Sequence, residues 1–238
     1  MRAVILAGGK GTRLRPYTTL IPKPLVPLGG RYSVLELVLM QLAKAGFDHV
    51  TLAVNHLSQL IMAYFGDGAR WGIRLDYSLE DKPLSTIGPL TLIDDLPDDF
   101  LVMNGDVLCD LDYRAFFEAH VARGSDVSVS AYRRDVHVDF GVLRYGADHA
   151  LEGFEEKPSL SFDVSMGVYC LSRRVVAALE RGRTYGFDDL MRDSLAHGRR
   201  VQVVPFAGYW LDIGRTDDYE YADEHFDELA ARLGIGLP

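Results

Sequence analysis

A glycine-rich loop follows the first apolar segment of the chain. Residues 6–14 read Leu6-Ala7-Gly8-Gly9-Lys10-Gly11-Thr12-Arg13-Leu14. The segment begins with the last two residues of the apolar run 3–7 and continues into the glycines. Glycine has no Cβ, so the backbone can turn sharply and bring its N–H groups close to phosphate oxygens. Arg13 adds a planar fork of donors that suits a polyphosphate. The loop indicates phosphate binding, although a glycine turn after a strand is also common without any ligand.

Two better-known phosphate loops do not fit this segment. A Walker A loop needs Gly-x-x-x-x-Gly-Lys-Ser/Thr, which the sequence does not supply. The dinucleotide fingerprint Gly-x-Gly-x-x-Gly fails because its third glycine position is Leu14. A nicotinamide-dependent oxidoreductase is therefore disfavoured, and a test of NAD(P) binding would exclude it.

A second cationic candidate lies between prolines. The segment Pro22-Lys23-Pro24 fixes the local backbone and holds one ammonium group in place. A cation held in this way could bind a phosphate at a reacting centre. The alternative is a rigid surface loop with a solvated lysine, and this segment alone leaves both interpretations open.

Two aspartates could serve a metal ion. Asp106 follows the apolar segment 100–104 after one glycine, and Asp212 follows Trp210-Leu211 far along the chain. Mg²⁺ prefers few protein oxygens together with waters and substrate phosphates, so two carboxylates at a triphosphate would suit it. Spacing does not show that the two converge, and a turn residue and a cap are the alternatives.

The elements that must position these residues alternate between strands and helices in the first half of the chain. Ser33 and Glu36 form a predicted capping box at the start of a helix that ends at Gly46. The apolar patterns predict strands over 3–7, 50–54, 73–77 and 100–104, and helices over 58–65, 90–96 and 112–123. This alternation predicts an α/β fold with a mostly parallel sheet and helices on both faces. In such a sheet, loops at the carboxyl ends of strands bind ligands.

The pattern changes in the second half of the chain. Closely spaced strands are predicted over 127–132, 142–145, 151–154, 164–171 and 201–206, and helices over 173–179, 188–197 and 217–233. No linker or internal repeat interrupts them, and hexapeptide repeats of a C-terminal β-helix are missing. We therefore expect one compact α/β unit.

Composition narrows the possible partners. The 238 residues carry a net charge of −9, which argues against nucleic acid or a membrane surface as the partner. Cys109 and Cys170 lie in apolar stretches, which predicts buried thiols in a reducing compartment. The first apolar run is too short for a signal peptide, and no run reaches membrane-spanning length. We expect a cytoplasmic protein.

The segment 6–27, LAGGKGTRLRPYTTLIPKPLVP, resembles the signature of the sugar-1-phosphate nucleotidyltransferases. These include glucose-1-phosphate thymidylyltransferases and the mannose- and heptose-1-phosphate guanylyltransferases. The resemblance extends to about residue 219. It implies a Rossmann-like fold of the nucleotide-diphospho-sugar transferase type, as a single domain over 1–238. The nucleotide-binding part would span about 1–125, the sugar-binding part about 126–215, and a C-terminal helix about 216–233.

The resemblance also implies roles for individual residues. Arg13, Lys23 and Asp106 would be catalytic, with Arg13 at the β and γ phosphates and Lys23 at the reacting phosphate. Asp106 and Asp212 would hold Mg²⁺, as the family's Gly-Asp and Trp-Leu-Asp-x-Gly motifs do. The nucleotide would contact the loop and a later segment that resembles Pro-Leu-Gly-Thr-Ala-Gly: Leu6, Ala7, Gly8, Gly9, Gly11, Thr12, Glu80, Pro83, Ser85 and Thr86.

The sugar phosphate would be bound by residues of the second half. Phe154-Glu155-Glu156-Lys157-Pro158 resembles the family's Glu-Lys-Pro motif, with Lys157 for the phosphate and Glu156 for a sugar hydroxyl, although such a sequence is also an ordinary charged turn. Gly141 matches a glycine that lines the sugar pocket. Ser165 stands where the family commonly has Asn.

Glu80 bears on the choice of base. An ionised Glu only accepts hydrogen bonds, and guanine offers two adjacent N–H groups on its pairing edge. Glu80 therefore predicts a mild preference for GTP over dTTP or UTP. A solvent-exposed Glu80 without a role is the alternative.

The sequence thus predicts a Mg²⁺-dependent transferase that joins a nucleoside triphosphate to a sugar 1-phosphate and releases pyrophosphate. The alternative from another class is a catalytically silent, ligand-sensing regulatory subunit of the same fold. Chains of this type without a β-helix often self-associate, which leaves a homo-oligomer open.

Overall fold

A seven-stranded sheet forms the centre of the computed structural model, which describes residues 1–236. Its strand order is β12-β8-β11-β6-β1-β4-β5. Most neighbours are parallel, and β11 runs antiparallel to both β6 and β8. The bounds are β1 (Arg2–Leu6), β4 (His49–Val54), β5 (Arg74–Leu79), β6 (Asp99–Asn104), β8 (Val127–His137), β11 (Ser159–Ser172) and β12 (Val201–Phe206).

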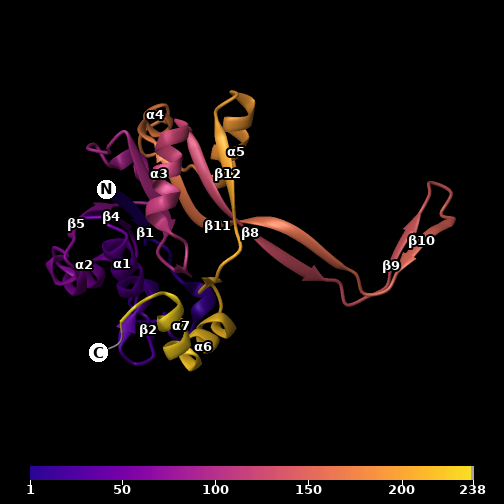
Figure 1. Cartoon of the computed structure of the whole chain (residues 1–238), viewed down its shortest axis with the longest axis horizontal. Coiled ribbons are helices and arrows are strands. Elements are labelled where there is room, and N and C mark those ends of the chain that lie inside the picture. Colours follow the sequence, from indigo (N-terminus) through magenta and orange to yellow (C-terminus); the bar gives the residue numbers. More distant parts are fainter. Residues whose placement is uncertain (237–238) are drawn as a thin grey trace.

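Helices cover both faces of this sheet, as the alternating pattern predicts (Figure 1). Successive residues of β1 point to opposite faces, so Ile5 packs in one core cluster and Val4 in the other. The first cluster includes side chains of α1, α2, α3, α6 and α7, and the second those of α4 and α5. The bounds are α1 (Val34–Lys44), α2 (Ser58–Phe65), α3 (Tyr113–Arg123), α4 (Arg173–Ala177), α5 (Phe187–Ala196), α6 (Thr216–Glu224) and α7 (Phe226–Arg232).

The predicted capping box at the start of α1 is confirmed. The Glu36 amide donates to the Ser33 hydroxyl at 3.2 Å, and the Ser33 amide donates to the Glu36 carboxylate at 2.7 Å. Both side chains are buried. The buried carboxylate also accepts from the Tyr64 hydroxyl at 2.9 Å and lies 3.5 Å from the Arg70 guanidinium. The cap therefore anchors α1 and joins it to α2.

Replacement of Ser33 by alanine is expected to lower the free energy of unfolding by about 1–2 kcal/mol, because a buried helix amide loses its acceptor. Urea unfolding measures the change. Ser172 is the matched control: it is a buried serine at the N-cap of α4, but its side chain makes no capping hydrogen bond. If Ser172→Ala destabilises the protein as much as Ser33→Ala, the capping bond is not the cause.

Two predicted helices differ in the structure. Of the helix predicted over 90–96, only residues 90–92 are helical, as the end of a short 3₁₀ helix, Gly88–Leu92. After Leu92 the backbone is no longer helical. The Asp95 carbonyl and carboxylate accept from the buried Arg2 guanidinium at 2.7 and 2.9 Å. The helix predicted over 217–233 is divided at His225 into α6 and α7, where the backbone turns so that Phe226 reaches the core.

Two short strand pairs complete the body. β2 (Pro27–Leu28) pairs with β3 (Tyr32–Ser33), and β7 (Val107–Cys109) pairs with β13 (Trp210–Asp212). The predicted burial of Cys109 and Cys170 is confirmed, and burial raises the pKa of both thiols. Within residues 1–236, no helix has the length and apolar character needed to cross a membrane.

A long arm leaves the body between β8 and β11. These two strands run well past the predicted ends at residues 132 and 164, and they remain paired as far as His137 and Ser159. Beyond them lie β9 (Val142–Tyr145) and β10 (Leu151–Glu155), which pair with each other. Figure 1 shows this β9–β10 hairpin standing far from the sheet and its helices. The expected compact unit thus carries a projecting arm, defined here as residues 133–163.

Candidate active site

The carboxyl ends of β1 and β6 bring the glycine loop and Asp106 to one edge of the sheet. The two strands are parallel neighbours with Leu6 opposite Asn104. The Gly105 amide donates to the Leu6 carbonyl at 3.0 Å. A Cβ on Gly105 would lie 3.1 Å from the Ile5 side chain, so glycine permits this close approach. The parallel-strand prediction of a shared edge is therefore confirmed for these two segments.

The loop that carries Arg13 folds against the segment that carries Lys23. Gly11 has a φ of +60°, and a Cβ there would lie 3.1 Å from the Cβ of Lys23. The Thr18 hydroxyl donates to the Gly11 carbonyl at 2.7 Å and closes this turn. Arg13 then lies on the short 3₁₀ helix Thr12–Leu14.

Lys23 forms an ion pair with Asp106. Its side chain is only 11% exposed, so it is not the solvated surface lysine of the alternative interpretation. The backbone around it forms a 3₁₀ helix, Lys23–Leu25, that begins after Pro22 and includes Pro24. The prolines therefore help to direct one buried cation at the carboxylate that follows β6.

Asp212 reaches the same place through the pairing of β13 with β7. Asp212 lies opposite Val107, the residue after Asp106, and the Ile213 amide donates to the Asp106 carbonyl at 3.0 Å. Burial raises the pKa of Asp212 and the negative charge of Asp106 raises it further, whereas Lys23 and Arg13 act in the opposite direction. The structure thus brings together two carboxylates that are more than one hundred residues apart in sequence.

This pair fits a hard divalent cation. A cation between two carboxylates relieves their mutual repulsion and stabilises the charged form of both. Mg²⁺ needs few protein ligands when waters and phosphates supply the rest. Residues 1–236 hold no group of three or more His, Cys, Asp or Glu side chains arranged to bind a metal by themselves. Asp106 and Asp212 would therefore suit a metal that takes its remaining ligands from water and a substrate.

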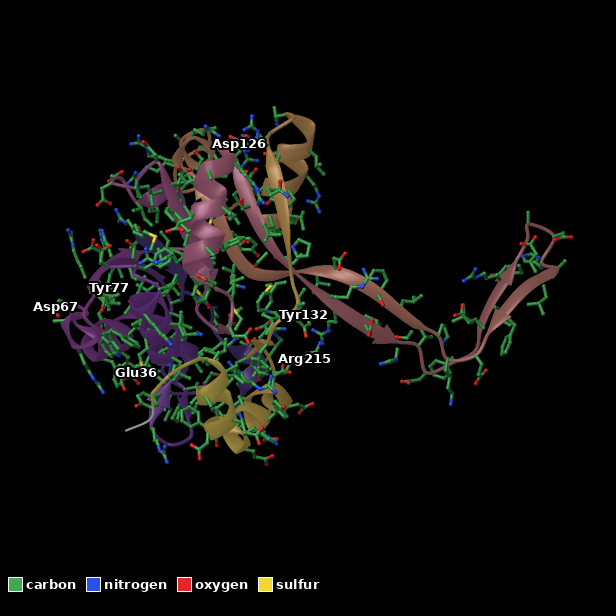
Figure 2. The ribbon with its side chains drawn as sticks, in the orientation of Figure 1. Glu36, Asp67, Tyr77, Asp126, Tyr132 and Arg215 are labelled. Atoms are coloured by element: carbon green, nitrogen blue, oxygen red, sulfur yellow. The ribbon has the colours of Figure 1, made fainter. Side chains whose placement is uncertain are left out.

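A cavity of about 330 Å³ opens beside these residues. Arg13, Asp212 and Gly214 line one side of it, and a Cβ on Gly214 would lie 3.4 Å from the Asp212 carboxylate and 3.6 Å from the Arg13 guanidinium. Two lining residues are labelled in Figure 2: Tyr132 lies where the arm leaves the body, and Arg215 directly precedes α6. A second cavity, of about 760 Å³, lies at the opposite edge of the sheet near the start of β6 and does not contain these groups.

Sequence reasoning missed four residues that line the smaller cavity and lie outside every motif. They are Tyr132, Arg134, Arg215 and Asp218. Arg215 directly follows the Trp-Leu-Asp-x-Gly motif, which was a usable signal. Arg134 belongs to a strand with no motif of its own, and only the course of β8 along the cavity identifies it.

Glu80 lies beside the glycine loop rather than free in solvent. Its Oε1 would be 2.9 Å from a Cβ on Gly8, and its Oε2 accepts from the Leu84 amide at 3.0 Å. Asn55 donates to the Glu80 carbonyl at 2.7 Å and fixes the end of β5. Burial raises the pKa of the Glu80 carboxyl. Oε1 has no hydrogen-bond partner within residues 1–236, so it remains able to accept from a ligand.

The segment after Glu80 keeps a glycine-like backbone without the glycine. Ser85 has a φ of +68°, the left-handed region that favours glycine, at the position where the family pattern has one. Thr86 accepts from the Phe187 amide at 2.7 Å, at the first residue of α5. Pro83 is exposed and its carbonyl accepts from Thr184 at 3.4 Å.

The predicted sugar residues divide into two groups. Ser165 lies in β11 at the base of the arm, where its hydroxyl is 3.0 Å from that of Tyr169. Gly141, Glu156 and Lys157 lie on the arm, and a Cβ on Gly141 would be 3.1 Å from the Glu156 carboxylate. All three are exposed. Glu156 and Lys157 thus lie between β10 and β11 on the projecting arm, whereas Asp106 directly precedes β7 and Asp212 lies in β13 of the body.

Residues 2–228 match the family model of the nucleotidyl transferases. The chain belongs to that family. A UTP–glucose-1-phosphate uridylyltransferase of Synechocystis is 32% identical over 239 residues, covering 92% of this chain and 61% of the relative. The mannose-1-phosphate guanylyltransferase catalytic subunit beta of Xenopus tropicalis is 33% identical over 227 residues, covering 92% and 62%. These names confirm the resemblance to sugar-1-phosphate nucleotidyltransferases, and the chain spans about six tenths of the length of these relatives.

A solved structure agrees with the fold. The crystal structure of HddC from Yersinia pseudotuberculosis superposes with a TM-score of 0.72 at 28% identity, and covers 94% of this chain and 99% of that one. HddC has also been solved in complex with GMP-PN. The predicted nucleotidyltransferase-like α/β fold is thus confirmed.

Proposed function

We propose that this nucleotidyl transferase joins a nucleoside triphosphate to a sugar 1-phosphate and releases pyrophosphate. The observation that supports this most directly is the convergence of Lys23, Asp106 and Asp212 beside the glycine loop. Two carboxylates and a buried ammonium at the carboxyl edge of a parallel sheet suit a polyphosphate and a metal ion. The names of the relatives support sugar 1-phosphates as the acceptors.

In this reaction a phosphate oxygen of the sugar attacks the nucleotide α-phosphorus in line, and pyrophosphate leaves. A phosphate monoester is already anionic at neutral pH, so the step needs no general base. The obstacles are repulsion between two anions and the charge that develops on pyrophosphate. Positioning and electrostatics therefore supply most of the rate enhancement.

The residues divide this work between them. Lys23 binds the α-phosphate and Arg13 binds the departing β and γ phosphates, while the loop amides from Gly8 to Thr12 hold the nucleotide. Asp106 and Asp212 would hold Mg²⁺. When bound there, the ion neutralises charge on the triphosphate. Lys157 receives the phosphate of the incoming sugar.

Pyrophosphate release tests the proposal and identifies the substrates. Purified protein with Mg²⁺ is incubated with each of GTP, dTTP, UTP, CTP and ATP against glucose, mannose, N-acetylhexosamine and heptose 1-phosphates. We expect release that requires both substrates. Protein that binds nucleotide but is inactive with every pair would instead favour the ligand-sensing regulatory subunit.

We further propose that GTP is mildly preferred, with Glu80 as the residue that recognises the base. Glu80→Gln keeps the shape of the side chain but replaces the charged acceptor, and should lower the GTP-to-dTTP ratio of kcat/KM about fivefold, a change of roughly 1 kcal/mol. Asp81→Asn, at the adjacent exposed carboxylate, is the control. Burial raises the pKa of Glu80, so on acidification this carboxylate becomes protonated at a higher pH than an exposed Glu does. The preference for GTP over dTTP should therefore be lost at that higher pH. Equal or better turnover of dTTP or UTP by the wild type would contradict this assignment.

A further inference from the structure

The cavity beside Asp212 holds more positive charge than the proposed function uses. Three arginines line it, Arg13, Arg134 and Arg215, together with the carboxylates Asp212 and Asp218. Arg13 and Asp212 have roles in the proposed transfer, whereas Arg134 and Arg215 have none. Guanidinium groups around one small cavity repel each other, and an anion bound between them relieves that repulsion.

No carboxylate of the chain neutralises these guanidiniums. Within residues 1–236, Arg13, Arg134 and Arg215 form no ion pair. Arg133, the neighbour of Arg134 in the strand, differs: it lies on the opposite face and pairs with Asp163 at 3.3 Å. A guanidinium presents a planar fork of donors that matches two phosphate oxygens. The three groups of the cavity are therefore available to a phosphate ligand.

The fold brings the three arginines together from separate segments. Arg13 lies on the short helix that follows β1, Arg134 lies on β8, and Arg215 lies between β13 and α6. A Cβ on Gly214 would be 3.6 Å from the Arg13 guanidinium, so the backbone that carries Arg215 runs directly past Arg13. The cluster therefore exists only in the folded chain.

Aromatic packing holds β8 against the cavity. Tyr132 and Arg134 are two residues apart in this strand, so they lie on the same face. The Tyr132 ring is 5.2 Å from the Trp210 ring, and both residues line the cavity. The indole N–H of Trp210 donates to the Met166 carbonyl at 3.1 Å. Arg134 therefore lines the cavity from a part of β8 that its aromatic neighbours hold in place.

The other lining residues indicate which phosphates the cavity receives. Arg13, which binds the β and γ phosphates in the proposed function, lines the cavity, whereas Lys23 and Asp106 at the reacting phosphate do not. None of the residues assigned to the sugar phosphate lines it either. Asp212 lines it and is also the neighbour of Asp106 through the β7–β13 pair. The cavity thus extends from the metal carboxylates on the side of the departing phosphates.

We propose that Arg134 and Arg215 bind the departing pyrophosphate together with Arg13. In the transfer, a sugar phosphate oxygen forms a bond to the α-phosphorus while the bond between the α-phosphorus and the oxygen that bridges to the β-phosphorus breaks. That oxygen keeps the electron pair and leaves with the β and γ phosphates, so negative charge grows beside this cavity. Preorganised cations there stabilise the leaving group. The inference rests on the proposed function and adds two residues that act on its leaving group.

Titration calorimetry with magnesium pyrophosphate tests the assignment without turnover. Arg134→Ala and Arg215→Ala should each raise the Kd of magnesium pyrophosphate about 10-fold, as the loss of a charge-assisted hydrogen bond does. Arg133→Ala is the matched control, because it removes an adjacent arginine that lies outside the cavity, and it should keep the wild-type Kd. Arg134→Lys and Arg215→Lys keep the charge without the planar fork, so they should recover part of the lost affinity.

The reverse reaction separates pyrophosphate from the other substrate. With a nucleotide sugar and pyrophosphate as substrates, each alanine variant should raise the KM of pyrophosphate about 10-fold and leave the KM of the nucleotide sugar unchanged. Alanine variants of an active enzyme that bind pyrophosphate as tightly as the wild type, or that change only the KM of the sugar 1-phosphate, would overturn the inference. A wild type that binds pyrophosphate through these arginines but releases none from any substrate pair would instead count against the proposed function.

Discussion

Lys23→Ala is expected to lower the rate of nucleotidyl transfer at least ~100-fold, the usual effect of removing a preorganised charge from a transition state. Lys23 is a largely buried cation whose ammonium forms an ion pair with the Asp106 carboxylate. Initial rates of pyrophosphate release measure the effect. The loss should appear mainly in kcat, since the charge acts on the reacting phosphate.

Lys44→Ala is the matched control for Lys23→Ala. Lys44 is an exposed lysine whose ammonium donates to the Gly234 carbonyl at 3.0 Å, so the control also removes a cation and one hydrogen bond. It should retain the wild-type rate. Asp106→Asn, which keeps the shape of the side chain, should lose as much activity as Lys23→Ala. A folded variant of either residue with a near-normal rate would remove that residue from the mechanism.

Chelation of divalent metal is expected to abolish turnover, and Asp212→Asn is expected to raise the Mg²⁺ concentration needed for half-maximal activity at least ~10-fold, as loss of one ligand does. Asp212 is partly buried against Asp106, so its carboxylate is favoured when a cation is present. Activity is measured against Mg²⁺ concentration after treatment with EDTA. The expected signature is a partial rescue of the variant at high Mg²⁺.

Asp217→Asn is the control for Asp212→Asn, because Asp217 lies close in sequence but is exposed on α6. Its Mg²⁺ requirement should match that of the wild type. Full activity in EDTA, or an Asp212→Asn variant with an unchanged Mg²⁺ requirement, would exclude the metal role assigned to this residue.

The sequence predicted the part of the site that lies at the ends of the neighbouring strands β1 and β6, because this part depends only on local patterns of apolar residues. The run at Ala3–Ala7 and the segment before Asp106 are apolar enough to form buried parallel strands, and the ends of parallel strands share an edge. The capping box at Ser33 depends on residues three apart and needs no tertiary information.

Other features depend on contacts that sequence spacing does not contain. Asp212 reaches Asp106 through a three-residue strand pair between β7 and β13, far apart in the chain. Ser85 adopts a positive φ that is typical of glycine, and a serine in the sequence does not predict this conformation. The helix predicted over 90–96 failed because the buried Arg2 guanidinium holds Asp95 outside a helix.

The arm was the largest departure from expectation. Its strands alternate apolar and polar residues as any half-buried strands do, so their sequence predicts a covered face but does not say which surface covers it. The sugar-binding roles of Gly141, Glu156 and Lys157, which lie on the arm, therefore remain predictions.

The fate of labelled phosphorus tests the central claim most directly. The protein is incubated with Mg²⁺, a sugar 1-phosphate and the triphosphate identified by the pyrophosphate assay, labelled with ³²P at either the α or the γ position. Attack at the α-phosphorus predicts that the α label appears in a nucleotide sugar and the γ label in pyrophosphate. A γ label that appears in inorganic phosphate or in the sugar, with no α label in a sugar product, would contradict nucleotidyl transfer at this site.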